Sequence, residues 1–270
     1  MARSDLGRML EVAESAVAAG AEVVRSSDLR AEGARKGPSG DYVTNVDRAA
    51  EAAVVGVLRD LNPDVAVLAE EGGGETAERY WVVDPLDGTT NFMHGFPLVG
   101  VAVGLVERSR PVVGVVRAPF LGETYAGARG LGAEVRRATG STRALRVSGR
   151  DPGEAVVGTG FPFRRKDRLE RYLAMFGRCM ERFEDLRRPG AASLDLAWTA
   201  DGVFDGFFEL GLAPWDVAAG GLLVEEAGGR VTDWQGGDTW LTTGNILAGP
   251  PEVHTALLEI ARETDVLRPR

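Results

Sequence analysis

Between Pro97 and Val147 the sequence runs through one short apolar strand after another, separated by glycines and prolines. From Ala155 onward the pattern changes, and short strands alternate with helical segments. A change of this kind indicates two architectures that meet near residues 140 to 150. We therefore predict an α+β half with an antiparallel sheet over residues 1–145 and an α/β half over residues 146–270.

Two helical segments open the chain. Apolar residues recur at helical spacing over residues 4–26 and again over residues 45–61, where Asn62 and Pro63 end the pattern. The segment between them, residues 26–44, is rich in glycine, serine and charge and is predicted to be a mobile loop. Both helices belong to the predicted α+β half.

Bulk properties argue against several classes of protein. The chain has 31 basic and 40 acidic residues and a net charge of −9, which argues against binding duplex nucleic acid through overall charge. The single cysteine, Cys179, excludes an intrachain disulfide and fits a reducing compartment. No apolar run is long enough to span a membrane, and the N-terminus lacks the apolar core of a signal peptide. We expect a cytoplasmic protein with no membrane partner.

Acidic residues repeatedly end apolar segments. In WVVDPLDGTTNF, residues 81–92, an apolar strand runs directly into Asp84, and Asp87 follows shortly after it. Carboxylates that close repel each other unless a cation or hydrogen-bond donors lie between them. Oxygen ligands of this kind suit hard cations such as Mg²⁺ or Mn²⁺. Glu70 and Glu71 end another apolar strand, Asp47 lies early in a predicted helix, and Asp216 opens a further helix.

Each of these acids also has an ordinary structural interpretation. DPLDG alone is most often a turn followed by a helix cap, and Asp47 and Asp216 both suit the first turn of a helix. Covalent catalysis has no candidate, because the sequence lacks the nucleophile-elbow and phosphate-loop motifs and has only His94 and His254 as histidines. The residues alone therefore leave both a capped turn and a metal site open.

Four motifs follow one another along the chain, namely DYVTNVD, LAEE, WVVDPLDGTTNF and PWDVAAGGLLVEEAGG. In this order and spacing they resemble the inositol monophosphatase family of magnesium-dependent, lithium-sensitive phosphatases, over almost the whole chain. The resemblance implies a layered α/β/α/β/α sandwich with the active site where the two halves meet. It also implies a homodimer and a small phosphate monoester as the substrate.

The resemblance further implies a set of metal ligands. Glu70, Asp84 and the carbonyl of Leu86 are expected to hold a first Mg²⁺. Asp84, Asp87 and Asp216 are expected to hold a second, and a third, weaker ion is expected near Glu70. Mn²⁺ is expected to substitute, and Ca²⁺ or Li⁺ to inhibit. In the absence of metal, the pKa values of Asp84 and Asp87 should be raised, because two close carboxylates resist ionising together.

Catalytic and substrate residues are implied in the same way. Thr89, hydrogen-bonded to Asp47, is expected to orient and help deprotonate the attacking water next to Glu70. Lys36, in the predicted loop at residues 26–44, is expected to close over the site as part of a lid. The residues expected to contact the substrate are Gly88, Thr89, Thr90, Gly190, Ala191, Ala192, Glu209 and Asp216.

The expected reaction is hydrolysis of inositol-1-phosphate by metal-activated water, with no covalent intermediate. Glu209, which the resemblance places against ring hydroxyls, favours a polyol, because a carboxylate can accept two hydroxyl hydrogen bonds. Fructose-1,6-bisphosphate, histidinol phosphate and 3′-phosphoadenosine-5′-phosphate are the alternative substrates. The alternative of another class is a regulatory protein that binds RNA polymerase, since some bacterial relatives have roles in transcription.

Overall fold

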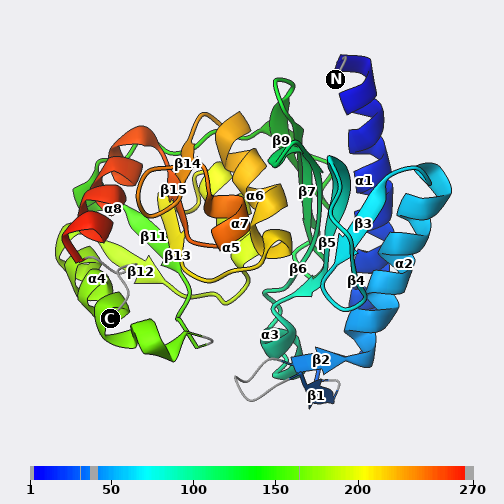
Figure 1. Ribbon diagram of the computed structural model, residues 1–270, viewed down its shortest axis with the longest axis horizontal. Coiled ribbons are helices and arrows are strands. Elements are labelled where there is room, and N and C mark those ends of the chain that lie inside the picture. The colour runs from blue at the N-terminus through cyan, green and yellow to red at the C-terminus, as the bar shows by residue number, and fades with distance from the viewer. Residues whose placement is uncertain (1–2, 31, 37–41, 164, 265–270) are drawn as a thin grey trace.

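The computed structural model describes residues 3–30, 32–36, 42–163 and 165–264. Its main elements form five layers, in which two sheets alternate with three layers of helices (Figure 1). This arrangement confirms the predicted layered α/β/α/β/α sandwich. The division into halves at residue 145 stays a prediction, because α5 (Ala192–Ala200) and α6 (Pro214–Glu226) pack against both sheets.

The larger sheet has eight strands in the order β10-β9-β8-β7-β6-β5-β3-β4. All neighbours pair antiparallel except β3 and β5, which run parallel. Helices α1 (Arg3–Ser26) and α2 (Asn45–Leu61) cover its outer face through their apolar stripes (Figure 1). The strands are β3 (Ala66–Ala69), β4 (Gly73–Gly74), β5 (Arg79–Asp87), β6 (Gly100–Glu107), β7 (Arg110–Ala118), β8 (Glu123–Ala128), β9 (Gly132–Arg137) and β10 (Thr142–Ala144).

The smaller sheet has five strands in the order β12-β11-β13-β15-β14. Strand β11 runs parallel to β12 and β13, whereas β15 runs antiparallel to β13 and β14. Its outer face is covered by α4 (Leu169–Arg182) and α8 (Pro251–Thr264) (Figure 1). The strands are β11 (Val156–Thr159), β12 (Asp185–Arg187), β13 (Gly206–Glu209), β14 (Arg230–Thr232) and β15 (Ile246–Gly249). The short helices are α3 (Thr89–Met93), α7 (Trp240–Thr243), η1 (Pro152–Glu154) and η2 (Lys166–Arg168).

Helix α6 can approach the large sheet closely because two strand residues lack side chains. A Cβ atom on Gly104 would lie 3.1 Å from the Cβ of Ala218, and one on Gly114 would lie 2.6 Å from the carbonyl oxygen of Ala219. The middle of α6, from Val217 to Val224, is therefore buried between the sheets. This close packing brings the first turn of α6 to the end of β5, where the predicted site lies.

Two parts of the sequence interpretation differ from the structure. The predicted loop at residues 26–44 contains two short strands, β1 (Gly33–Arg35) and β2 (Tyr42–Thr44), which pair antiparallel. Residues 31 and 37–41 of that loop lie outside the described residues. The interpretation also omitted helix α8, which places Val253, Leu257 and Ile260 at helical spacing against the smaller sheet. Within the described ranges, no helix is both long and apolar enough to cross a bilayer.

Candidate metal and phosphate site

The end of β5 carries two of the predicted metal ligands. Asp84 and Asp87 lie on either side of a bulge, where the pairing of β5 with β6 shifts register. Helix α6 brings Asp216 to the same place from the layer between the sheets. Each of the three carboxylates offers an oxygen atom that lies within 4.8 Å of the other two. Residues that are far apart in sequence thus form one acidic cluster.

The electrostatics of this cluster are unfavourable for the charged acids. Burial raises the pKa of Asp84 well above its ordinary value, and the charges of Glu70, Asp87 and Asp216 raise it further. Burial also raises the pKa of Asp87 to about 6, although hydrogen bonds from Ser193 partly offset that effect. Both pKa values are raised, as predicted, but burial is the first cause in each case and the repulsion between carboxylates comes after it. A divalent cation fits this cluster, because its charge would remove the mutual repulsion of the carboxylates.

Hydrogen bonds from the main chain fix the directions of both acids on β5. The backbone N–H and the hydroxyl of Ser193 donate to Oδ2 of Asp87, at 2.7 and 2.6 Å. The backbone N–H of Leu86 donates to Oδ1 of Asp84 at 3.1 Å. A further backbone hydrogen bond, from Ala192, also lowers the pKa of Asp87. Carboxylates whose orientation is fixed by hydrogen bonds are expected in a preorganised metal site.

The interpretation of these acids as helix caps also holds for two of them. Asp47 forms a capping box with Thr44 at the start of α2, and Asp216 accepts a hydrogen bond from the backbone N–H of Ala213 at 2.7 Å. Capping uses one carboxylate oxygen in each case. Capping and participation in the site are therefore compatible.

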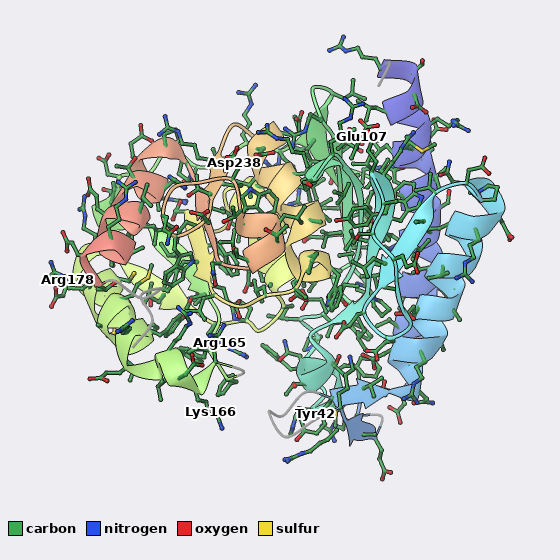
Figure 2. All side chains as sticks on the ribbon, in the orientation of Figure 1. Tyr42, Glu107, Arg165, Lys166, Arg178 and Asp238 are labelled. Atoms are coloured by element: carbon green, nitrogen blue, oxygen red, sulfur yellow. The ribbon has the colours of Figure 1, made fainter. Side chains whose placement is uncertain are left out.

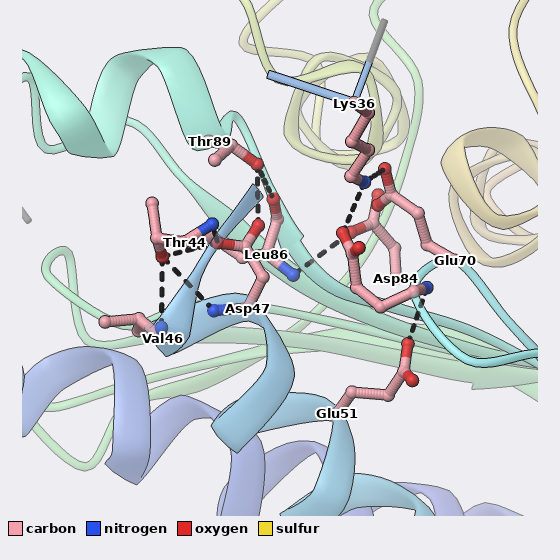
Figure 3. A network of polar contacts seen from close by, with 10 residues as sticks. Lys36, Thr44, Val46, Asp47, Glu51, Glu70, Asp84, Leu86 and Thr89 are labelled. Atoms are coloured by element: carbon pink, nitrogen blue, oxygen red, sulfur yellow. Dashed lines mark hydrogen bonds and ion pairs between the residues drawn. The ribbon is translucent and has the colours of Figure 1, made fainter. Parts of the chain in front are cut away.

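Thr89 connects the start of α3 to the start of α2. Its hydroxyl lies 2.8 Å from Oδ1 of Asp47 and 3.2 Å from the carbonyl oxygen of Leu86 (Figure 3). The other carboxylate oxygen of Asp47 accepts from the N–H and the hydroxyl of Thr44, at 2.8 and 2.5 Å. Asp47 is completely buried, and these bonds fix its carboxylate behind Thr89. The hydrogen bond predicted between Thr89 and Asp47 is present.

Lys36 reaches the acidic residues from the end of the β1 segment (Figure 3). Its ammonium group lies 2.8 Å from Oε1 of Glu70 and also forms an ion pair with Glu71. Burial lowers the pKa of Lys36, but the hydrogen bonds to both glutamates outweigh that effect and raise the pKa above its ordinary value. The backbone of Glu71 is held in turn by Glu51 of α2, whose carboxylate accepts its N–H at 2.8 Å.

The first turn of α3 lies beside this cluster. Gly88 precedes the helix in the left-handed region, at φ 94°, which a residue with a side chain adopts only with strain. The side chain of Asn91 donates to the carbonyl oxygens of Leu98 and Pro189, at 2.7 and 2.9 Å. These two bonds tie α3 to the segment before α5 and so fix the turn that contains Gly88, Thr89 and Thr90.

A cleft of about 480 Å³ opens above the acidic cluster. Most of the predicted site residues line it, and Glu209 extends along its far wall, where a Cβ atom on Gly160 would lie about 2.0 Å from the Glu209 carboxylate. The predicted residues in the lining are Glu70, Asp84, Leu86, Asp87, Gly88, Thr89, Thr90, Gly190, Ala192, Glu209 and Asp216.

Ala191 lies beneath the cleft and not in its lining, so its predicted contact with the substrate stays a prediction. Its exposed fraction is 1%, it belongs to the hydrophobic core between the sheets, and it does not line the cleft. The methyl group lies below Gly88, where a Cβ on that glycine would be 3.5 Å from it. Ala191 therefore supports the turn at Gly88 from beneath, and its neighbours Gly190 and Ala192 form the wall.

Three residues near the site were not singled out from the sequence. Ser193 orients Asp87, and Glu51 orients the segment that carries Glu70. Asp195 is buried next to them, and burial followed by the charges of Glu209 and Asp87 raises its pKa well above the ordinary value. The spacing of Asp47 and Glu51 on one helical face was an available signal for Glu51. The sequence offered no comparable signal for Ser193.

Comparisons with known proteins agree with this geometry. Residues 5–265 match the model of the inositol monophosphatase family. The Nus factor SuhB of Pseudomonas aeruginosa is 48% identical over 226 residues, which cover 81% of this chain and 82% of that protein.

Two solved structures are similar in fold. The extragenic suppressor protein suhB from Bartonella henselae has a TM-score of 0.86 at 37% identity, over 95% of this chain and 99% of that one. The inositol monophosphatase from Anabaena (Nostoc) has a TM-score of 0.83 at 36% identity, over 96% of this chain and 97% of that one. With a family match over nearly its whole length, this chain belongs to the inositol monophosphatase family.

Proposed function

We propose that this chain is a cytoplasmic, Mg²⁺-dependent phosphate monoester hydrolase whose substrate is inositol-1-phosphate. One observation carries the proposal. Asp84, Asp87 and Asp216 each offer an oxygen atom within 4.8 Å of the other two at the floor of a cleft. Lys36 is paired with Glu70 and Glu71, and burial and the acids around Asp84 and Asp87 raise the pKa values of both. Such a cluster is destabilised as it stands and is suited to a hard divalent cation.

The residues divide between two principal ions, as the family resemblance implies. Glu70, Asp84 and the Leu86 carbonyl would hold the first Mg²⁺, and Asp84, Asp87 and Asp216 the second. Bound magnesium supplies charge neutralisation at the phosphate and lowers the pKa of water. A third, weaker ion near Glu70, substitution by Mn²⁺ and inhibition by Ca²⁺ or Li⁺ belong to the same proposal.

Residues of the chain position the attacking water molecule and accept its proton. The Thr89 hydroxyl donates to the buried carboxylate of Asp47, so its oxygen can accept a hydrogen bond from a water molecule in the cleft. The proton of that water moves through Thr89 to Asp47, while Glu70 orients the water from the other side. The backbone N–H groups of Gly88, Thr89 and Thr90 receive the phosphate oxygens, since the first turn of a helix leaves its N–H groups without partners within that helix.

The substrate alcohol lies toward the far wall of the cleft. Glu209 accepts hydrogen bonds from ring hydroxyls there, with Gly190 and Ala192 leaving room for the ring. Fructose-1,6-bisphosphate, histidinol phosphate and 3′-phosphoadenosine-5′-phosphate remain the alternative substrates. The fit of a polyol rests on Glu209.

Phosphate release from a panel of these esters tests the proposal. The natural chain should release phosphate only with Mg²⁺, and Li⁺ should reduce the rate. Asp87→Asn should abolish release, because it removes one charged ligand from the cluster. Asp238→Asn is the matched control, since that aspartate is 82% exposed in its side chain and lies outside the cleft. Turnover that survives in Asp87→Asn, or no turnover on any ester, would contradict the proposal.

We also propose that the protein is a homodimer. Helix α4 exposes an apolar stripe in which Leu169, Leu173 and Met180 are 46%, 54% and 65% accessible. These residues are four and seven positions apart, so they lie along one face of the helix. A second copy of the chain would cover them. Sedimentation should detect a dimer for the natural chain and a monomer for Leu173→Glu, and an unchanged mass for Leu173→Glu would place the interface elsewhere.

A second function is favoured by the names of the relatives, several of which are called Nus factor SuhB. It is the regulatory role through RNA polymerase. Co-purification with RNA polymerase tests it, and Asp87→Asn separates it from catalysis. Association retained by this variant would support a role independent of hydrolysis. Absence of association for the natural chain would remove the second function.

A further inference from the structure

The cleft has two chemically different ends. Acids form its floor, whereas its mouth is lined by basic and aromatic side chains. Figure 2 shows Arg165 and Lys166 on the side of the smaller sheet and Tyr42 on the opposite side, and all three line the same cleft. The residues of this mouth are Phe161, Phe163, Arg165, Lys166 and Arg188. A cleft of this volume falls within the range of sites for drug-sized ligands, which leaves space beyond the acidic floor.

Arg188 is held in a fixed position at this mouth. Its guanidinium carbon lies 5.7 Å from the ring centre of Phe161 and 5.6 Å from that of Phe163. A Cβ on Gly190 would lie 2.6 Å from Nη1 of Arg188, so the guanidinium group lies directly over that glycine of the cleft wall. Aromatic contacts of this kind orient a guanidinium group without using its five N–H donors.

Among the described residues, Arg188 acts on the buried carboxyl of Asp195 through its charge but forms no ion pair with it. In the described ranges no carboxylate forms an ion pair with Arg188 or with Lys166, whereas the neighbouring Arg187 pairs with Asp185. Arg165 differs from both, because Asp167 lies 3.0 Å from it. Within the part of the chain that the structure describes, Arg188 and Lys166 therefore face the cleft without an ion-pair partner, and Arg188 presents a fixed planar donor set. Such a group suits a phosphate or a carboxylate.

We propose that the mouth is a subsite for a second anionic group of the substrate. The inference rests on the proposed function and deepens it. The scissile phosphate binds over the acidic floor, and a second phosphate or carboxylate on the same small molecule binds Arg188 and Lys166. The preferred substrates are then doubly anionic esters, of which only the group over the floor is hydrolysed. This assignment makes Arg188 and Lys166 specificity-determining residues.

Two substrates that differ by one phosphate test the subsite. Inositol 1,4-bisphosphate and inositol 1-phosphate are compared through the ratio of their kcat/KM values, measured by phosphate release. The natural chain should prefer the bisphosphate. Arg188→Gln and Lys166→Gln should each reduce that preference by about tenfold, the scale of a lost hydrogen bond to a charged group. Arg188→Lys should retain part of the preference, because it keeps the charge and loses the planar fork.

Arg187→Gln is the matched control, since it removes an adjacent arginine that is already paired and lies outside the cleft lining. It should leave the ratio unchanged. A ratio that stays the same in both Arg188→Gln and Lys166→Gln would overturn the subsite. No phosphate release from either ester by the natural chain would instead count against the proposed function. In that case calorimetric affinities for the same two ligands decide the subsite, and equal affinities would overturn it.

Discussion

Buried acids occur in two very different surroundings in this molecule. The carboxylate of Asp201 is fully buried and lies 3.1 Å from Arg137 and 2.5 Å from Arg143. Those arginines come from β9 and β10 and tie the edge of the large sheet to the end of α5. Asp84 and Asp87 are buried as well, but their charged neighbours are other acids. Among the described residues, Asp201 is paired directly with arginines, whereas the nearby Lys36 is paired with Glu70 and Glu71.

The difference indicates what each acid does. Burial raises the pKa of Asp201, and the two arginines offset only part of that rise. Asp205 is likewise paired, with Arg150 at 2.8 Å, and it also accepts the N–H of Val156 at 2.7 Å. A buried acid that is already paired holds elements together. A buried acid that faces other acids requires a cation from outside.

Exchanging one acid for an amide in each surrounding should have opposite effects on stability. Asp84→Asn should raise the melting temperature of the metal-free protein, because it removes a charge that is buried and repelled. The same variant should lose the stabilisation by Mg²⁺, which is about 2.7 kcal/mol at 100 times Kd for an intact site. Its phosphatase activity should fall roughly 100- to 1,000-fold. Thermal unfolding with and without Mg²⁺ measures the first two effects.

Asp201→Asn should instead destabilise the protein by about 1–2 kcal/mol, since it weakens charged hydrogen bonds to arginines that are partly exposed. The stabilisation of the folded protein by Mg²⁺ should be the same in this variant as in the natural chain. A metal-free Asp84→Asn protein that melts at a lower temperature than the natural chain would remove the distinction between the two surroundings.

The pH dependence of stability should follow from Asp87. Its pKa is about 6 in the folded protein against an ordinary 3.8, so the folded state binds a proton more tightly than the unfolded state. The free energy of unfolding without metal should therefore fall as pH rises through this window and level off above it. Saturating Mg²⁺ should suppress the fall, because a bound cation favours the charged carboxylate.

Denaturant unfolding of the natural chain and of Asp87→Asn, in chelator, isolates this contribution. His254 acts in the opposite direction, because burial and the charge of Arg230 lower its pKa to about 4. The stability it contributes is present above an ordinary pKa of 6.5 and is lost as pH falls through its folded value. The contribution of His254 is the same in the natural chain and in Asp87→Asn, so it cancels when their free energies of unfolding are subtracted. A difference that is flat with pH would show that Asp87 ionises normally.

Periodicity and motif spacing predicted most of the fold. The helices at residues 4–26 and 45–61 and the strands between Pro97 and Arg137 match the structure closely, because their buried faces impose regular spacing. The strand predicted over residues 144–148 overlaps β10 at Ala144 alone. The hairpin of β1 and β2 was missed, since its residues are mostly half-buried or exposed and show no apolar alternation. Val43 and Thr44 are buried, but two adjacent buried residues do not give the alternation by which a strand is recognised.

The candidate site was predictable only in part for a similar reason. Acids at the ends of apolar segments are visible in the sequence, and the structure brings Asp84, Asp87 and Asp216 together. The donors that orient them are not visible in the same way. Ser193 lies 106 residues beyond Asp87, and only the packing of α5 against the large sheet places its N–H and hydroxyl beside that carboxylate. The hydrogen bonds from Ser193 to Asp87 therefore depend on tertiary packing and cannot be predicted from local sequence.

Of the variants at the acidic cluster, Ser193→Ala should have the smallest effect on Mg²⁺ binding. It tests how hydrogen bonds orient the acidic cluster. The variant removes the hydroxyl donor at 2.6 Å and keeps the backbone N–H at 2.7 Å, so Asp87 loses one of two donors to the same oxygen. The pKa of Asp87 should rise further, since hydrogen bonds to the charged form had lowered it. Affinity for Mg²⁺ should fall by about tenfold, the lower end of the range for residues that orient a metal ligand. Calorimetric Mg²⁺ titration measures it, with Ser193→Thr as the control that keeps a hydroxyl; equal losses in both variants would assign the effect to packing rather than to the hydrogen bond.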